Sequence, residues 1–133
     1  IKNNIFETIE QNNEQFFNMG ITNKDSNIEN SLEYLNLSAF NKDKDAYYNL
    51  AIIYKNSVDG IQDSLKSAYY MKMAADLGHP AAANEYAIML ATEDGVLQNI
   101  DEAKQYFNIA IENGNTEAEK NLISLNNFLS LDK

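Results

Sequence analysis

The stretch Gly78-His79-Pro80-Ala81-Ala82 lies between two copies of one pattern, and the spacing of the copies decides the fold. Gly78 and Gly114 are separated by 36 positions, and the alanines at 46, 82 and 118 keep the same interval. A fixed period between about 20 and 50 residues is typical of stacked supersecondary units. The spacing therefore predicts a chain built from repeats.

Other positions recur at the same interval and divide into large and small side chains. Large residues fill the gap between two helices, whereas small residues let two backbones approach, so this alternation favours close helix-on-helix packing. The large columns are Tyr34, Tyr70 and Tyr106, then Leu35, Met71 and Phe107, then Leu50, Tyr86 and Leu122, and the small columns are Ser38, Ala74 and Ala110, then Ala51 and Ala87.

The order of these columns resembles a known family. The first copy reads Ala46-x3-Leu50-Ala51-x2-Tyr54, then Gly60-Ile61-Gln62-Asp63, then Tyr70-Met71-x2-Ala74-Ala75-x2-Gly78-His79-x2-Ala82. The second reads Ala82-x3-Tyr86-Ala87-x2-Leu90, then Gly95-Val96-Leu97-Gln98-Asn99-x3-Ala103-x2-Tyr106-Phe107-x2-Ala110-x3-Gly114-x3-Ala118. Over about residues 27–126 the chain resembles the Sel1-like repeats, relatives of the tetratricopeptide repeats. It departs from them in two features: Ala51 and Ala87 stand where the family usually has Gly, and the first inter-helix loop is one residue shorter before Asp63.

The resemblance implies an all-α solenoid of antiparallel helix pairs, wound as a right-handed superhelix whose inner surface is lined by the first helix of each pair. It also implies a non-enzymatic module for protein–protein interaction. We expect one domain over residues 1–133, with an N-terminal partial repeat at 1–45, repeats at 46–81 and 82–117, and a C-terminal capping helix at 118–133.

Apolar spacing and capping residues predict the individual helices. They are expected over about residues 1–19, 26–40, 45–56, 63–77, 82–92, 99–113 and 115–129. The predicted core includes Tyr47, Leu50, Ala51 and Tyr54 in one helix, Tyr69, Tyr70, Met73, Ala74 and Leu77 in the next, and Ala118, Leu122, Leu125 and Leu129 in the last. The last helix either shields the terminal core or begins a repeat that continues in a longer parent protein.

Composition limits the classes of function. The net charge is −10, with twenty acidic residues and ten lysines, so the surface repels nucleic-acid phosphates and anionic lipid head groups. The acidity favours a cationic partner or simply keeps the protein in solution. The absence of cysteine excludes disulfides and thiolate chemistry but names no compartment. No stretch of the sequence is long and apolar enough to span a bilayer, and the first residues show no signal-peptide pattern.

Candidates for catalysis or metal binding are few, and no cofactor is expected. Residues 23–27 place oxygen ligands at alternate positions like a calcium loop, but Ile28 stands where the turn needs Gly and Tyr34 where a bidentate Glu is required. Ser26 and Glu29 instead form a capping box that opens a helix. His79 is the single histidine and lies between Gly78 and Pro80, so we expect it to fix a helix junction.

The candidate binding surface is a face of the first helices adjacent to their predicted buried stripe. Its predicted members are Tyr48, Ile52 and Lys55, then Asn84, Ile88 and Ala91, and on the last helix Lys120, Ser124 and Asn127. Apolar side chains in register, ringed by polar ones, are typical of a groove that binds a peptide or helix. Ile52 and Ile88 could equally complete the packing between neighbouring repeats. An alternative function is a small acidic inhibitor, of the immunity type, that occludes a basic enzyme.

Overall fold

The computed structural model describes residues 43–56 and 63–131, and in these ranges all regular secondary structure is α-helical. The helices are α3 (Lys44–Lys55), α4 (Ser64–Asp76), α5 (Pro80–Thr92), α6 (Ile100–Glu112) and α7 (Thr116–Leu131). The helices expected over residues 1–19 and 26–40, the N-terminal partial repeat and the rejected calcium loop lie outside the described residues.

Short polar side chains start the helices where the sequence predicts caps. The Asp63 carboxylate accepts a hydrogen bond from the Lys66 backbone N–H at 3.0 Å, and the Asn99 side chain accepts one from the Glu102 N–H at the same distance. Such bonds satisfy backbone donors that the first helical turn leaves without a partner. The Asn99 side-chain amide also donates to the Glu102 carboxylate at 3.2 Å, whereas the Asn99 backbone N–H donates to the Leu90 carbonyl, so the second bond of a capping box is not made.

Two glycines end the second helix of each pair. Gly78 has φ +90° and Gly114 has φ +95°, and both lie directly after the last turn of α4 and α6. Glycine tolerates this left-handed conformation because it has no Cβ. The chain therefore reverses at equivalent positions in the two repeats, as their spacing predicted.

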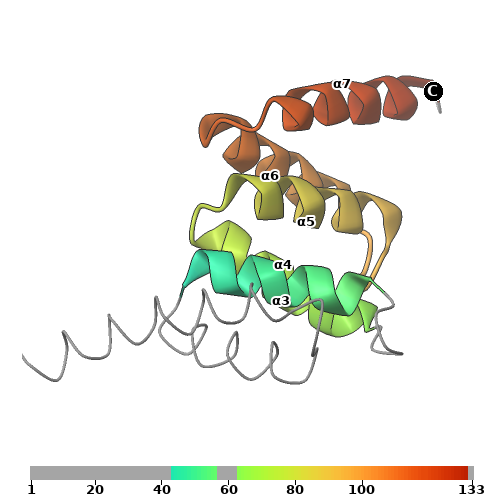
Figure 1. Cartoon of the computed structure of the whole chain (residues 1–133). Helices are drawn as coiled ribbons and strands as arrows, with labels where there is room; N and C mark the ends of the chain where they lie inside the picture. The colour runs from blue at the N-terminus through green and yellow to red at the C-terminus, as the bar shows by residue number, and fades with distance from the viewer. Residues whose placement is uncertain (1–42, 57–62, 132–133) are drawn as a thin grey trace, which may run out of the picture.

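The helices form stacked antiparallel pairs, which confirms the all-α solenoid. Figure 1 shows the pair α3–α4 below the pair α5–α6, with α7 above them. Within the stack α4 contacts α5, and α6 contacts α7. Small buried side chains such as Ala74, Ala87 and Ala110 let the backbones approach, and Leu50, Met71 and Phe107 fill the space between them.

Several apolar residues differ from the prediction in their burial. Tyr69 is 61% exposed and Leu77 is 42% exposed, so neither belongs to the core that we predicted for α4. Tyr70 is only half-buried, whereas Ile53, which was not predicted, is buried. The reason is that α4 carries apolar residues around most of its circumference, so periodicity alone cannot tell its covered side from its outer side.

Candidate functional site

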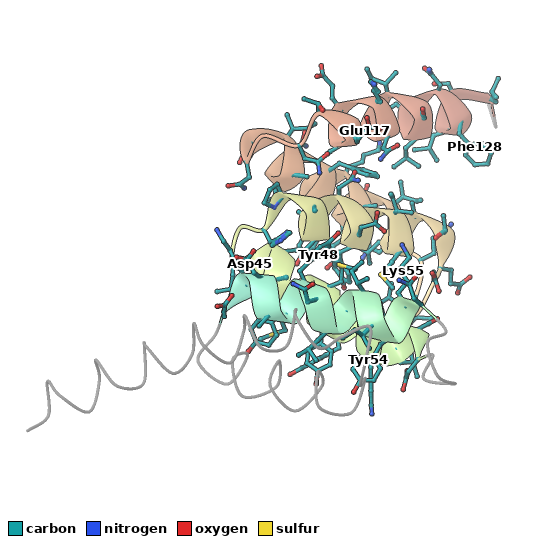
Figure 2. The ribbon with its side chains drawn as sticks, viewed as in Figure 1. Asp45, Tyr48, Tyr54, Lys55, Glu117 and Phe128 are labelled. Carbon is teal, nitrogen blue, oxygen red and sulfur yellow. The ribbon has the colours of Figure 1, made fainter. Side chains whose placement is uncertain are left out.

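The first helices of successive pairs provide the candidate surface. Figure 2 shows Tyr48 and Lys55 on the side of α3 that faces α5, with Tyr54 on the opposite side. This separation follows from the helical repeat, because residues 48, 52 and 55 lie four and three positions apart and share one face. Side-chain contacts then join α3 to α5 and α5 to α7 along this face.

An ion pair crosses from α3 to α5. The Lys55 ammonium donates to the Glu85 carboxylate at 2.5 Å, and the two side chains remain 39% and 27% exposed. An ion pair with this much contact with water is worth about 1 kcal/mol or less. It therefore fixes the relative position of two side chains on the surface more than it stabilises the fold.

His79 holds the junction between the two repeats, as the sequence predicted. Its Nδ1 accepts the backbone N–H of Ala82 at 3.1 Å and so caps α5, while its ring stacks on Tyr48 with centroids 4.3 Å apart. Because Nδ1 accepts, the proton of the neutral ring lies on Nε2, which is 3.3 Å from the Asp45 carboxylate. Burial lowers the pKa of His79, and the opposing attraction of Asp45 is the smaller effect.

Tyr48 forms part of the same junction. Burial raises the pKa of its hydroxyl, and the nearby Glu85 carboxylate raises this pKa further, whereas Lys55 acts in the opposite direction. The hydroxyl therefore stays protonated at neutral pH and can act as a hydrogen-bond donor. Tyr48, Lys55 and Glu85 thus make one polar group at the contact between α3 and α5.

The contact between α5 and α7 is made by two amides. The Asn121 side chain donates to the Asn84 side-chain oxygen at 3.0 Å. Asn84 is only 7% exposed, and no other hydrogen bond of its side chain is made within the part of the chain that the structure describes. Leaving a buried polar group without a partner costs about 1 to 3 kcal/mol.

The structure divides the remaining predicted residues into two groups. Ile52, Ile88 and Ala91 are half-buried and pack against the hydrophobic core, so they fill the space between helices and also keep part of their surface accessible. Lys120 and its partner Glu117 are 74% and 68% exposed on α7, 3.6 Å apart. Ser124 and Asn127 are exposed on the same helix.

Three residues of this surface were not predicted, namely Asp45, Glu85 and Asn121. Comparison of positions at the 36-residue interval does not find them, because their contacts join residues separated by 34, 30 and 37 positions. A helical-wheel reading of α5 could have found Glu85, since it lies three positions before Ile88.

Other parts of the described surface show fewer features of a binding site. A hollow of about 420 Å³ lies over α6, lined by Asn99, Asp101, Glu102, Gln105, Tyr106 and Ile109. Among the residues that the structure describes, no group of three or more His, Asp or Glu side chains could hold a metal ion. None of the described helices has the length and hydropathy needed to cross a membrane.

Comparison with known proteins identifies the repeat. Residues 44–79 and 80–115 each match the family model described as the Sel1 repeat. The chain belongs to the Sel1 repeat family. The matched repeats begin two residues before the predicted boundaries at 46 and 82. They start at the first residues of α3 and α5, Lys44 and Pro80.

Relatives of this Sel1 repeat chain include one curated protein and several solved structures. Chitin synthase regulatory factor 2 of Schizosaccharomyces pombe is 44% identical over 64 residues, which are 47% of this chain and 12% of that protein. A Sel1 repeat protein from Oxalobacter formigenes superimposes with a TM-score of 0.77 at 19% identity, over 90% of this chain and 97% of that one.

Two further structures share the fold. Cysteine rich protein B of Helicobacter pylori gives a TM-score of 0.68 at 21% identity over 74% of both chains. The antigen c5321 of uropathogenic Escherichia coli gives 0.71 at 22% identity, over 81% of this chain and 25% of that one. These likenesses show the solenoid fold. The present chain spans a small part of the fission yeast relative and of the E. coli antigen.

Proposed function

We propose that this protein is a non-enzymatic interaction module that binds a peptide or protein segment on its inner face. The inner face is the side of α3, α5 and α7 that carries Ile52, Ile88, the Lys55–Glu85 ion pair and the Asn84–Asn121 amide pair. Proteins built from Sel1 repeats generally mediate protein–protein interactions, which supports this class of function. The single observation that supports placing the binding site on this face is that the face is continuous. Direct side-chain contacts join α3 to α5 and α5 to α7 along it.

The chemistry of the face suits a protein segment. Half-buried Ile52 and Ile88 offer apolar contact area, and the polar pairs beside them supply donors and acceptors. Interfaces of this kind bind through a few buried apolar anchors surrounded by polar groups. The net charge of −10 favours a partner segment that carries positive charge over a nucleic acid. Neither the fold nor the relatives favour the acidic-inhibitor alternative.

The test uses a peptide selected from a random library of lysine-containing sequences against the whole chain. Ile88→Asp should weaken binding of that peptide at least about tenfold, because an unpaired carboxylate would be buried in an apolar contact. The matched control is Leu65→Asp, since Leu65 is 74% exposed on α4, away from the inner face. Circular dichroism of both variants checks that the helices persist.

Ile88 also contacts the core, so a milder pair of variants keeps the proposal testable if Ile88→Asp unfolds. Glu85→Lys places two like charges together, and the double variant Glu85→Lys with Lys55→Glu restores an ion pair of reversed direction. We expect affinity for the lysine-containing peptide to fall in the single variant, because it adds positive charge to the face, and to recover in the double variant. Unchanged affinity in folded variants of Ile88 and Glu85 contradicts the proposed surface.

A further inference from the structure

We infer that the hollow over α6 binds the guanidinium group of an arginine side chain that a partner protein presents. This inference goes beyond the proposed function, because the hollow is separate from the inner face. Its six lining residues all belong to α6 or to the N-cap of that helix. A volume of about 420 Å³ lies within the range of small-molecule sites, so a guanidinium group and part of its alkyl chain fit.

The hollow is acidic, and its carboxylates have free oxygens. Asp101 and Glu102 lie in the first turn of α6, where the helix dipole stabilises negative charge. Asp101 is exposed and makes no hydrogen bond or ion pair within the described part of the chain. One Glu102 oxygen accepts from Asn99, and the other has no partner among the described residues. The hollow therefore offers unpaired negative charge to a cation.

The wall beside these carboxylates is partly apolar. It contains the ring of Tyr106, whose hydroxyl donates to the Asp76 carboxylate at 2.6 Å, and the aliphatic side chain of Ile109. A guanidinium group is planar and weakly hydrated and packs well against aromatic rings, whereas an ammonium group is compact and strongly hydrated. An apolar wall next to two carboxylates therefore favours arginine over lysine.

A buried hydroxyl next to the hollow lacks a partner. Tyr86 is 4% exposed and packs edge-on against Tyr106, and its hydroxyl makes no hydrogen bond to any residue that the structure describes. Burial raises the pKa of this hydroxyl most, and Glu102 is the next cause, so the hydroxyl lies close to the acidic side of the hollow. Buried polar groups almost always have a partner. A guanidinium has five N–H donors, so it can bond to both carboxylates and still donate to the Tyr86 oxygen.

The equivalent positions of the preceding repeat have a different chemistry. The residues 36 positions before Asp101 and Glu102 are Leu65 and Lys66. The Lys66 ammonium lies 5.3 Å from the centroid of the Tyr54 ring, so at this place the chain itself supplies the cation. Of the two described repeats, the second is the one that presents free carboxylates here, and the inferred contact is specific to it.

Nuclear magnetic resonance titration of the unmodified protein tests the inference. The probe is acetyl-arginine-amide, and the matched control is acetyl-citrulline-amide, whose urea group has nearly the same shape but no charge. We expect the arginine probe to shift the Gln105 side-chain NH₂ and the backbone amides of Asp101 and Glu102 in a saturable manner. Citrulline should bind at least about tenfold more weakly, because the charge-assisted hydrogen bonds are lost. Acetyl-lysine-amide should also bind more weakly than the arginine probe.

Variants identify the groups that make the contact. Asp101→Asn should weaken binding of the arginine probe about two- to fivefold, the range for an exposed ion pair. The matched control is Glu112→Gln, which removes one negative charge from an exposed position in the last turn of the same helix, outside the hollow. Tyr86→Phe should weaken binding as well, without lowering the midpoint of thermal unfolding, because its hydroxyl has no partner in the free protein.

Equal binding of the arginine and citrulline probes would overturn the inference, because the charge would then play no part. Equal losses in Asp101→Asn and Glu112→Gln would overturn it too, since the acidic surface would then attract cations without a defined site. Unchanged affinity in Tyr86→Phe would mean that water satisfies the hydroxyl and would remove the buried contact. Tighter binding of free arginine than of the capped probe would overturn the assignment to a partner side chain.

The inner face is tested with a different ligand, the selected peptide, and with variants of Ile88 and Glu85. Loss of that peptide in those variants, together with no response of α6 to the arginine probe, would overturn this inference and keep the proposed function. The reverse pair of results would keep the arginine site and overturn the proposed inner face.

Discussion

At the residue scale, His79 couples the stability of the fold to pH. Its Nδ1 accepts the Ala82 N–H, so protonation there replaces an acceptor by a donor and breaks the cap of α5. Burial is the largest influence on the pKa of His79 and lowers it; of the charged groups on α3, Lys44 lowers this pKa further and Asp45 raises it. A histidine with a lowered folded-state pKa contributes stability that is present above about pH 6.5 and lost as the pH falls.

We therefore predict that the free energy of unfolding decreases between about pH 6.5 and pH 5, before most carboxylates titrate. His79→Asn keeps a capping acceptor at the same position but does not titrate, so its stability should vary less over this window. Denaturant unfolding of both proteins at several pH values measures the difference. Parallel pH profiles for the two proteins would show that His79 does not carry the effect.

A second prediction at this scale concerns Tyr106. Its hydroxyl donates to the Asp76 carboxylate at 2.6 Å, and burial together with this bond raises its pKa. Tyr106→Phe should lower the free energy of unfolding by about 1 to 3 kcal/mol, because the bond involves a charged acceptor. The control Tyr54→Phe should change it by less than about 0.5 kcal/mol, since no hydrogen bond of that hydroxyl lies within the described residues.

Alanine substitution should affect stability differently at Tyr106 and Tyr70, although the two tyrosines occupy equivalent positions of the 36-residue repeat. Tyr106 is 8% exposed and packs edge-on against Tyr86, whereas Tyr70 is half-buried. Tyr106→Ala should cost about 3 to 5 kcal/mol of unfolding free energy, the range for a buried aromatic side chain, and Tyr70→Ala should cost less. Equal losses measured by urea unfolding would mean that the two positions are equally buried in solution.

At the scale of the element, the glycines of the turns differ in what surrounds them. A Cβ on Gly95 would lie 2.1 Å from the Ser64 carbonyl oxygen at the start of α4, whereas a Cβ on Gly114 would meet no atom within 4 Å. Both residues have positive φ, at +75° and +95°. Gly95 therefore has a packing role as well as a conformational one, because the loop before α6 lies against the preceding pair.

Alanine substitutions separate these roles. Gly114→Ala should lose about 1 to 2 kcal/mol of unfolding free energy, the cost of a left-handed residue with a Cβ. Gly95→Ala should lose more, because the backbone of α4 must also move, and overpacking adds about 1 to 3 kcal/mol. Thermal unfolding of the two variants, compared with the parent, checks the order. A smaller loss at Gly95 would contradict the close approach to Ser64.

The sequence predicted the positions of the helices more accurately than it predicted which side of each helix is buried. The glycines, the caps at Asp63 and Asn99 and the alanine columns have local causes, so α4, α5 and α6 could be located from the chain alone. The side of a helix that meets solvent depends on what packs against it, which explains the error at Tyr69. For the site, the sequence predicted only a row of residues along one face of each helix. It did not predict the partners Glu85 and Asn121, because their contacts cross between neighbouring repeats and do not follow the 36-residue interval.

At the scale of the whole molecule, the excess of acidic residues should affect association kinetics. Opposite charges raise the association rate of a cationic partner, and salt screens them over about 10 Å at 0.1 M. We predict that the on-rate of the selected lysine-containing peptide falls as salt rises from about 50 to about 500 mM, with a smaller change in its off-rate. Surface plasmon resonance measures both rates. A flat on-rate would leave the charge of −10 as a determinant of solubility only.

The central claim is that α3, α5 and α7 together form the binding face of this Sel1 repeat protein. Backbone amide chemical-shift mapping with the selected peptide tests this most directly, because it needs no substitution in the protein. The account predicts the largest shifts around Ile52, Lys55, Ile88 and Asn121, and small ones on the outer residues Leu65 and Tyr69 of α4. Largest shifts on the outer sides of α4 and α6, with the inner face unchanged, would contradict it.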